Sequence, residues 1–461
     1  MCRNANIRKV NNYSIGNLLG LYSILFFFII ISSILSFSFT VFLVQLFLAT
    51  ITIPFINKKS HEMIRLYILI YAISIIFIFV VYSSYESYYG LPYYLGGSDD
   101  LSYEKWGYDV YNSNMYNPSK ILKSGVLDQF HSSPFFVVYI SLLIRLANMF
   151  DGYSTFIPRI VNVYFLLWIC IILEHLLKKY AKFDNKKIYM TIAIFTLMPN
   201  IQYINSHVFR DTFNLFQIFF IIYLVDKSFL CKIKIKNILY IITLFFMLYI
   251  TYYTRKNSIA FAAAIILLMI FDKIRYKKTY IIILTLLLIM LSGSILKVFN
   301  INYFIETYSN YVSNLAGEGM SNFIFSQKLL PFGIFFRAIY GLIIPFPNFF
   351  SLFNSMDKLL YDIIYLFIYS GVILQVLFIP FIVKRIFKLD FLSLSFLTFY
   401  MGVIITTFTF RHVILYYPFM AAIVVDGYMT SSKGEKTQYM TLSLFLGISL
   451  GLIYMVIKIF G

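Results

Sequence analysis

Two adjacent carboxylates, Asp99 and Asp100, are the residues of this sequence whose type and spacing most directly suggest chemistry. They stand in LGGSDDLSYEKW, residues 95–106, a short distance after a long apolar stretch. The two glycines before them allow a flexible turn. Such a pair suits a general base that removes a proton from a hydroxyl group, or a ligand set for a divalent cation. The alternative interpretation is a solvated loop in which an Asp caps the next helix.

Two further segments place an arginine beside another ionisable residue at the end of an apolar stretch. SHVFRDTFN, residues 206–214, carries Arg210 and Asp211, and a later segment carries Arg411 and His412. Ionisable groups in such places are costly unless they are paired or face water, so they indicate function. Arginine suits bidentate contact with a phosphate or pyrophosphate, and His412 would add a donor. The alternatives are a local Arg–Asp pair that caps a helix and an arginine that anchors its helix at the interface.

Other cations and aromatic residues on the same predicted side complete the candidate set. Four of the cations are candidates for contact with a lipid phosphate, although each also fits an interfacial anchor: Arg159, Arg255, Lys256 and Arg337. His131 begins HSSPFF. It either lines the site that these candidate residues would form or has a structural role. The tyrosine-rich segment SYESYYGLPYY, residues 84–94, fits a surface that stacks on sugar rings, or an aromatic belt at the membrane interface.

Long apolar helices must position these groups. Of the 461 residues, 60% are hydrophobic and only 13% are charged, too few to cover a soluble fold of this length. Apolar runs of about 18 residues, each long enough to cross the hydrocarbon core, recur along the chain. We therefore predict an all-α, polytopic integral membrane protein, a single transmembrane domain over residues 1–461. The predicted spans, about 13 in number, are 14–35, 37–57, 64–84, 157–177, 188–205, 212–226, 237–254, 257–272, 280–297, 361–383, 391–410, 412–428 and 439–458.

The distribution of basic residues predicts the orientation. Well over half of the 38 Lys and Arg residues fall in seven short segments, one at the N-terminus and one after each even-numbered span. The positive-inside rule then places the N-terminus in the cytoplasm. Most of the 20 carboxylates fall on the opposite face, which is where the candidate residues lie. The first apolar run is expected to be a retained span, because no small-residue cleavage site follows it.

Two long segments between spans, about 85–156 and 298–360, are predicted to lie on the non-cytoplasmic side. The stretch 134–149 is apolar but contains Arg145, and counting it as a span would move the basic cluster 178–187 to the outside. We therefore predict a juxtamembrane helix there. The stretch 329–350 is excluded from the spans in the same way, because it contains an arginine and three prolines.

The charge and cysteine patterns exclude other classes of function. A net charge of +18 might suggest nucleic acid, but the charges lie in short clusters between apolar runs, so no nucleic-acid partner is expected. The partner expected from composition is the lipid bilayer. Three cysteines, none near another or near a histidine at metal-ligand spacing, predict neither a disulfide framework nor a zinc site.

The order of these motifs resembles that of the GT-C superfamily of membrane glycosyltransferases, such as protein O-mannosyltransferases and lipid A aminoarabinose transferases. In that family an acidic pair in the first large outer loop precedes an HPPL-like juxtamembrane segment. Here Asp99 and Asp100 precede HSSPFF at 131–136, followed by MFDGYSTFIPRIVN at 149–162 and LLKKY at 176–180. The resemblance covers about 55–215 and 405–428. It maps a second acidic residue to Asp211 and the arginine before a late proline-containing span to Arg411. The chain is also broadly similar to O-antigen and capsule polysaccharide polymerases.

The resemblance implies transfer of a sugar from a polyprenyl-phosphate-linked donor to a glycan or lipid acceptor, on the non-cytoplasmic face of a bacterial inner membrane. Asp99, Asp100 and Asp211 would be the catalytic carboxylates. The predicted phosphate contacts are Arg411, Arg210, His412, Arg159 and Arg337. No cofactor is required, and a divalent metal on Asp99, Asp100 or Asp211 is left open. The rival interpretations are a repeat-unit polymerase that uses polyprenyl-pyrophosphate-linked glycan, and a transporter or flippase of a lipid-linked glycan.

Overall fold

The computed structural model describes residues 15–94, 99–127, 133–228, 236–273, 333–345, 352–406 and 410–460, together with 324, 347 and 349. Every regular element in these ranges is a helix, which confirms the predicted all-α class. The chain divides by its contacts into two compact units. Unit 1 comprises residues 1–179, 183–262 and 348–371, and unit 2 comprises 180–182, 263–347 and 372–461. The prediction of one transmembrane domain over the whole chain stays a prediction.

Helices occupy every predicted span except 280–297, which lies outside the described residues. The agreement follows from composition, since a long apolar run satisfies its own backbone hydrogen bonds only as a helix in lipid. The bounds are α1 Ile15–Leu35, α2 Phe39–Ile56, α3 His61–Tyr89, α7 Phe156–Leu176, α8 Asn185–Leu197, α9 Pro199–Asn205, α10 Arg210–Ser228, α11 Lys236–Thr254, α12 Asn257–Lys273, α17 Leu359–Ile386, α18 Phe391–Thr406, α19 Tyr417–Met429 and α20 Lys433–Phe460.

Five of these helical segments are long and apolar enough to cross a membrane, or six if a bent pair counts as one span. The five are Phe39–Ile56, His61–Tyr89, Phe156–Ala181, Asn237–Thr254 and Met356–Ile386. The bent pair is α9 with α10, whose axes differ by 101°. These segments are what an integral membrane protein requires, because each has at least the roughly 18 residues that a span needs.

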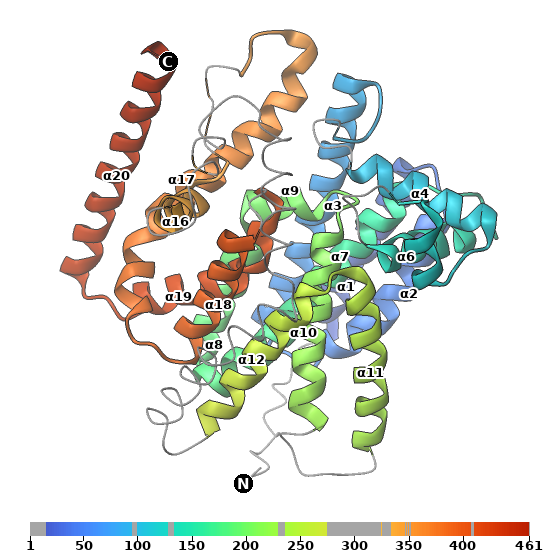
Figure 1. Ribbon diagram of the computed structural model, residues 1–461, viewed down its shortest axis with the longest axis horizontal. Helices are drawn as coiled ribbons and strands as arrows, with labels where there is room; N and C mark the ends of the chain where they lie inside the picture. The colour runs from blue at the N-terminus through green and yellow to red at the C-terminus, as the bar shows by residue number, and fades with distance from the viewer. Residues whose placement is uncertain are drawn as a thin grey trace. The chain divides into compact units, whose positions relative to one another are not determined.

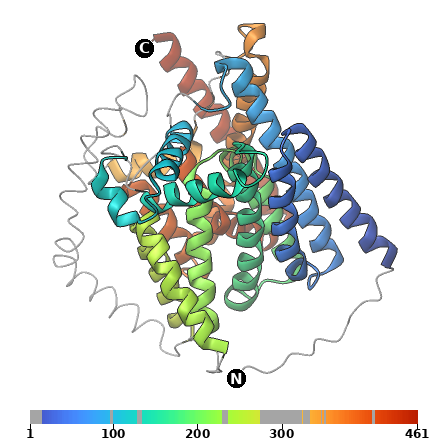
Figure 2. The ribbon, with the colours of Figure 1, turned by 90° about the vertical axis from the view of Figure 1, so that its right-hand side faces the viewer.

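Helix α7 forms the core of unit 1. It is apolar on all sides, and such a helix is buried all round rather than along one stripe. In the 18-residue window that best fits a span, 83% of the residues are buried. Helices α2, α3 and α10 pack around it (Figure 1). Figure 2 shows α1, α2 and α3 side by side at one edge of this unit, drawn in blue.

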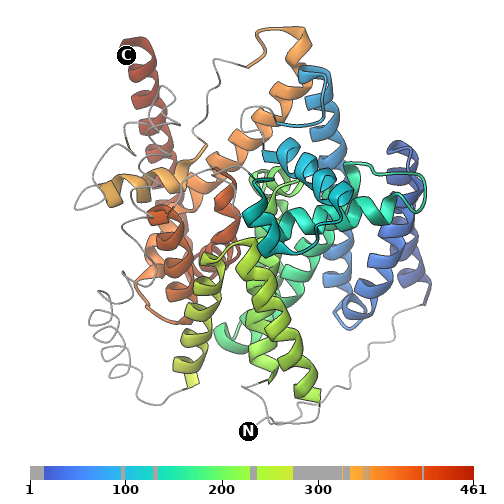
Figure 3. The same cartoon turned by 45° about the vertical axis from the view of Figure 1, so that its right-hand side comes forward.

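Three helices fill the predicted outer segment 85–156, namely α4 Asp99–Ser113, α5 Pro118–Ser124 and α6 Pro134–Ala147. Prolines at the first positions of α5 and α6 suit a helix start, where a missing N–H costs nothing. Helices α4 and α6 approach closely at Gly107, where an added Cβ would lie 2.6 Å from Cγ2 of Ile140. With 14 residues α6 is about 21 Å long, shorter than the hydrocarbon core. It runs crosswise to α10 and α11 (Figure 3).

The predicted span 188–205 is interrupted. Helix α8 ends at Leu197, and Met198 is extended, with φ −62° and ψ 126°. The proline that follows accounts for this, because a residue before proline is pushed out of the helical region. Helix α9 then ends at Asn205, and the chain turns through residues 206–209 before α10 begins at Arg210. The sequence prediction carried one span through this break because apolar residues precede Pro199 and resume at Ile201.

Unit 2 contains α16 Ile334–Ile343, α18, the 3-10 helix η5 Phe410–Leu415, α19 and α20, with the C-terminal part of α17. In the described part of 329–350, α16 has only ten residues, fewer than a span needs. The Tyr416 hydroxyl donates a hydrogen bond to the Gly341 carbonyl (2.7 Å), and that of Tyr400 donates to the Ala338 carbonyl. Two tyrosines thus hold α16 against the α18–α19 pair.

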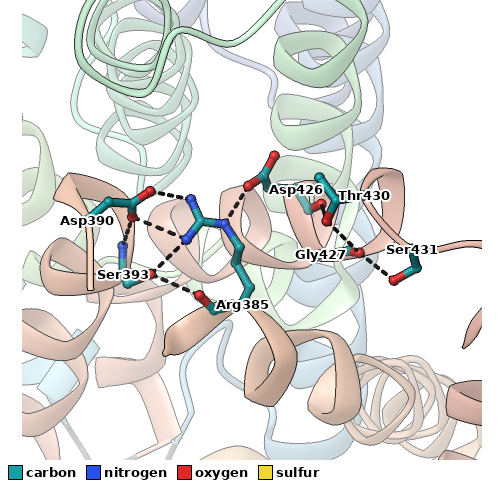
Figure 4. A network of polar contacts seen from close by, with 7 residues as sticks. All are labelled: Arg385, Asp390, Ser393, Asp426, Gly427, Thr430 and Ser431. Carbon is teal, nitrogen blue, oxygen red and sulfur yellow. Dashed lines mark hydrogen bonds and ion pairs between the residues drawn. The ribbon is translucent and has the colours of Figure 1, made fainter. Parts of the chain in front are cut away.

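A buried arginine joins the ends of three helices in unit 2 (Figure 4). The Arg385 guanidinium, at the end of α17, donates to the carboxylates of Asp390 and Asp426 and to Oγ of Ser393. The Nη2–Oδ2 distance to Asp390 is 2.5 Å, and that from Nη1 to Ser393 is 3.0 Å. Arg385 and Asp426 are both buried. Arg385 therefore compensates the buried negative charge of Asp426 on α19.

We expect Arg385→Met to lower the melting temperature of the purified protein by several degrees. Removing one partner of a buried ion pair costs about 3–5 kcal/mol, because the other charge stays buried. Lys388→Met, which removes an exposed cation from the next turn, is the matched control and is expected to leave the melting temperature unchanged. Equal melting temperatures for the two variants would contradict this account.

Candidate functional site

The break between α9 and α10 gathers an unusual number of buried polar side chains for so apolar a chain. Those with no exposed surface include Asn205, His207, Asp211, Thr212 and Asn214. Burying polar groups costs free energy unless they find partners inside the protein. Interrupted helices that bring such groups together inside membrane proteins mark binding sites. This break is therefore the centre of the candidate site.

Asp100 and His207 form a buried hydrogen-bonded pair. Nδ1 of His207 lies 2.8 Å from Oδ2 of Asp100, and neither residue has exposed surface. Because a carboxylate only accepts, Nδ1 carries the proton, and the carboxylate holds the imidazole in one tautomer and one orientation. Within the described residues Oδ1 of Asp100 has no hydrogen-bond donor.

The N-terminus of α4 presents both predicted acids to this region. Asp99 and Asp100 occupy the first turn of α4, and Asp99 is 7% exposed. Carboxylates are favoured there by the partial positive charge of a helix start. Their burial excludes the alternative of a solvated loop. It is consistent both with a role at the start of α4 and with a catalytic role.

Aromatic rings enclose the imidazole. The His207 ring stacks on Phe209 with centroids 4.5 Å apart and lies edge-on to Tyr203 at 4.6 Å. The hydroxyl groups of Tyr203 and Tyr85 are 2.6 Å apart, and Tyr85 also contacts the ring of Tyr361. The tyrosine-rich segment 84–94 thus contributes Tyr85 directly to the wall beside the Asp100–His207 pair. Such flat aromatic walls suit a sugar ring.

Helix α7 holds the segment between α9 and α10 in place. Nη1 of Arg159 donates to the Ser206 carbonyl (3.1 Å), and its Nη2 donates to the Pro92 carbonyl. Nδ2 of Asn162 donates to the His207 carbonyl (2.9 Å). Arg159 was predicted to contact a phosphate, but here it is fully buried against backbone carbonyls. These contacts make it a residue that positions His207.

Arg210 and Asp211 are neighbours in sequence but have different partners among the described residues. Asp211 is buried, and its Oδ1 lies 3.6 Å from Nη1 of Arg255, just beyond the end of α11. Arg210 donates to Oγ of Ser133, and its guanidinium lies over the Tyr103 ring, 5.9 Å from the centroid. The local Arg–Asp cap considered from the sequence is therefore not formed. Arg255, which comes from another element, lies near the buried Asp211 carboxylate instead.

Ser133 connects these elements. It precedes α6, accepts from Arg210, and donates through Oγ to the Thr254 carbonyl at the end of α11 (2.8 Å). The starts of α4, α6 and α10 and the end of α11 thus meet at one place. Three helix starts supply partial positive charge together with Arg210 and Arg255, while the end of α11 and the carboxylates of Asp99, Asp100 and Asp211 oppose it.

Glu104 is a further acid of this region, and the sequence analysis did not select it. One turn after Asp100 on α4, it accepts hydrogen bonds from Tyr93, Tyr153 (2.9 Å) and Thr155 (2.6 Å). Burial raises the pKa of Glu104, and the hydrogen bonds and the Arg159 charge only partly oppose it. It lines a cavity of about 430 Å³ together with Asp151.

Asp151 serves the start of α2. Its carboxylate accepts from the backbone N–H groups of Phe39 and Thr40 and from the Thr40 hydroxyl. Burial alone would raise the pKa of Asp151, but these hydrogen bonds outweigh it and lower the pKa. Asp151 is therefore a charged cap, in contrast to Glu104 in the same cavity.

The structure brings Asp99, Asp100, Asp211, Arg159 and Arg210 together in unit 1. Arg255 and Lys256 also belong to unit 1. Three other predicted residues belong to unit 2: Arg337 is buried in α16, while Arg411 and His412 lie in η5, half-buried and buried respectively. His131 lies outside the described residues. Their predicted roles in phosphate binding stay predictions.

A metal site is not assembled in the described part of the chain. No group of three or more His, Cys, Asp or Glu side chains there is placed to hold an ion. The divalent metal left open for Asp99, Asp100 and Asp211 would need ligands from its substrate or from other residues.

Sequence reasoning missed His207 and Glu104 for different reasons. His207 lies inside the selected segment 206–214, but its hydrogen-bond partner, Asp100, lies 107 residues earlier in the chain. A usable sign in the sequence was that this histidine follows an apolar run that Pro199 interrupts. Glu104 lies four residues after Asp100, on the same helical face, which was a usable sign once α4 was taken as a helix.

We expect Glu104→Gln to change how stability depends on pH. The folded protein holds the Glu104 proton more tightly than the unfolded chain does, so this group favours folding below its ordinary pKa of 4.5. That contribution is lost as the pH rises through the raised pKa. The melting temperature of Glu104→Gln relative to the unsubstituted protein should therefore increase from pH 5 to pH 8. The exposed Glu86→Gln is the control, and parallel curves for all three proteins would refute the assignment.

Known proteins provide no direct precedent for this arrangement. No protein-family model matches the chain, and no characterised protein or solved structure is significantly similar to it. The function is therefore inferred from the residues of this chain, which is a helical protein with apolar helices long enough to span a membrane.

Proposed function

We propose that this chain is a membrane glycosyltransferase. It would move a sugar from a polyprenyl-phosphate-linked donor to a glycan or lipid acceptor on the non-cytoplasmic face, in the assembly of a cell-surface polysaccharide. The observation that supports this most is the buried Asp100–His207 pair beside an aromatic wall and two arginines. The set offers a proton acceptor, a surface for a sugar ring and positive charge for a phosphate.

We further propose about 13 spans, a cytoplasmic N-terminus and a location in a bacterial inner membrane. Three helices support this orientation. Helices α3, α7 and α10 each have one end at the candidate site and the other end beside the basic residues of one pocket, which include Lys58, Lys178 and Lys227. Acidic chemistry at one end and lysines at the other is the arrangement that the positive-inside rule favours.

The proposed reaction needs a base and a stabilised leaving group. The acceptor hydroxyl oxygen would attack the anomeric carbon while Oδ1 of Asp100 takes its proton. The bond from that carbon to the phosphate oxygen then breaks, and the lipid phosphate leaves with the electron pair. His207 would keep the Asp100 carboxylate in its orientation. Arg210 and Arg255 are the nearest described cations that could compensate the phosphate charge.

Substitution of the acids tests the proposal. We expect Asp100→Asn to reduce glycan transfer by a factor of about 10²–10⁴, which is the usual contribution of a general base. The measurement is the amount of surface glycan, and of accumulated lipid-linked sugar by mass spectrometry, in cells that carry only the variant. Asp109→Asn, an exposed carboxylate on the same helix, is the control. Full glycan production by a well-expressed Asp100→Asn protein would exclude this base.

Two rival functions have their own support. The two arginines at the site, Arg210 and Arg255, favour a repeat-unit polymerase, in which arginines would outweigh carboxylates. The 101° break between α9 and α10 favours a transporter or flippase of a lipid-linked glycan, because such proteins bind substrate at interrupted helices.

The variants also separate these alternatives. If alanine at Asp99 and Asp100 leaves glycan synthesis intact and Arg411→Ala abolishes it, the chain is a polymerase. If the purified protein moves a lipid-linked glycan across liposomes and forms no glycosidic bond, it is a transporter. We expect loss of transfer with alanine at Asp100 and with alanine at Arg411.

A further inference from the structure

A second pocket, of about 470 Å³, lies at the opposite ends of the helices that build the candidate site. It is formed by the end of α2, the turn before α3, the end of α7, the start of α8 and the end of α10. Its charged lining consists of Lys58, Lys59, Lys178, Lys227, Glu174 and His175. All of these residues belong to unit 1.

The acidic residues of this region are already neutralised by other cations. Nζ of Lys59 lies 2.9 Å from Oε2 of Glu174. The fully buried Asp226 contacts Nζ of Lys179 at 2.7 Å and Nε2 of His175 at 2.8 Å. Glu174 and Asp226 therefore each have a counter-charge, and the cations of the pocket that contact neither of them are surplus.

Three lysines form that surplus: Lys58, Lys178 and Lys227. Within the described residues none of them pairs with a carboxylate. Lys58 and Lys227 lie over aromatic rings instead, 5.5 Å from the centroid of Phe55 and 5.3 Å from that of Tyr223. Three like charges around one pocket repel each other, and an anion would relieve that repulsion.

Apart from the polar Ser60 and Asn185, the other lining residues are apolar or aromatic. Phe55, Met63, Ile171 and Ile188 share the pocket with the lysines. Phe55 also contacts Trp168, with ring centroids 4.6 Å apart, and Trp168 donates to Oγ1 of Thr52. An aromatic pair at the end of membrane-spanning helices is typical of the interface between headgroups and acyl chains. A soluble anion would make no favourable contact with these apolar side chains, whereas an acyl chain would.

We propose that this pocket binds the phosphate headgroup of an anionic phospholipid. The phosphate contacts Lys58, Lys178 and Lys227, and the start of an acyl chain lies on Phe55 and Ile171. Basic pockets between helices at the cytoplasmic side are the places where anionic headgroups bind. The lipid would hold the ends of α2, α7 and α10 together. This inference does not depend on glycosyl transfer.

The test uses the full-length protein, purified in a neutral detergent, and a triple variant with Lys58→Gln, Lys178→Gln and Lys227→Gln. The control removes the same charge elsewhere in unit 1, with Lys105→Gln, Lys120→Gln and Lys123→Gln, all exposed. The probes are phosphatidylglycerol, phosphatidylcholine and inorganic phosphate. Bound lipid is counted by native mass spectrometry, and stabilisation is measured as the rise in melting temperature.

We expect phosphatidylglycerol, and not phosphatidylcholine, to bind and stabilise the unsubstituted protein and the control. Binding to the triple variant should be on the order of 100-fold weaker, since each lysine near an anionic lipid contributes a factor of roughly five. Equal binding by the triple variant would overturn the proposal. Stabilisation by inorganic phosphate as large as that by phosphatidylglycerol, and lost in the triple variant, would replace the lipid with a soluble anion. If the triple variant does not fold, the single variant Lys178→Gln is used instead. Its affinity for phosphatidylglycerol is expected to fall roughly fivefold. An unchanged affinity would overturn the assignment.

Discussion

The Asp100–His207 hydrogen bond determines how the end of unit 1 that contains the start of α4 is arranged. It joins the first turn of α4 to the short segment between α9 and α10, so two parts of the chain that are far apart in sequence must meet. Both groups are buried, and neither would be tolerated there without the other. Arg159 and Asn162 hold the same segment through its carbonyls. The position of the break in the helix thus follows from the need to satisfy buried polar atoms.

The same constraint explains why the polar groups cluster at helix ends. Inside a helix the backbone atoms are already paired, while a start leaves N–H groups open and an end leaves carbonyls open. Arg159 donates to open carbonyls, Ser133 donates to the Thr254 carbonyl, and Asp151 accepts from the start of α2. The candidate site is therefore built largely from helix termini, and these also supply its positive potential.

Charge is treated differently at the two ends of the central helices. At the end near α4 the acids are buried among tyrosines and arginines, as with Glu104 and its three hydroxyl donors. At the other end the acids are neutralised and lysines remain in excess around an open pocket. An end with buried, fixed charge suits chemistry on a bound substrate. An end with surplus, solvated charge suits contact with an anionic surface.

The sequence alone determined the helical class, the position of nearly every described helix and the residues at their ends, because apolar runs and charge clusters are local properties. It also pointed to Asp99, Asp100, Arg210 and Asp211 as a group worth attention. Only the tertiary structure decided that Asp100 pairs with His207, that Asp211 pairs with Arg255, and that Arg159 lies against carbonyls. Such pairings join residues tens to a hundred positions apart, and they depend on how helices pack. The local periodicity of the sequence does not predict which helices pack together.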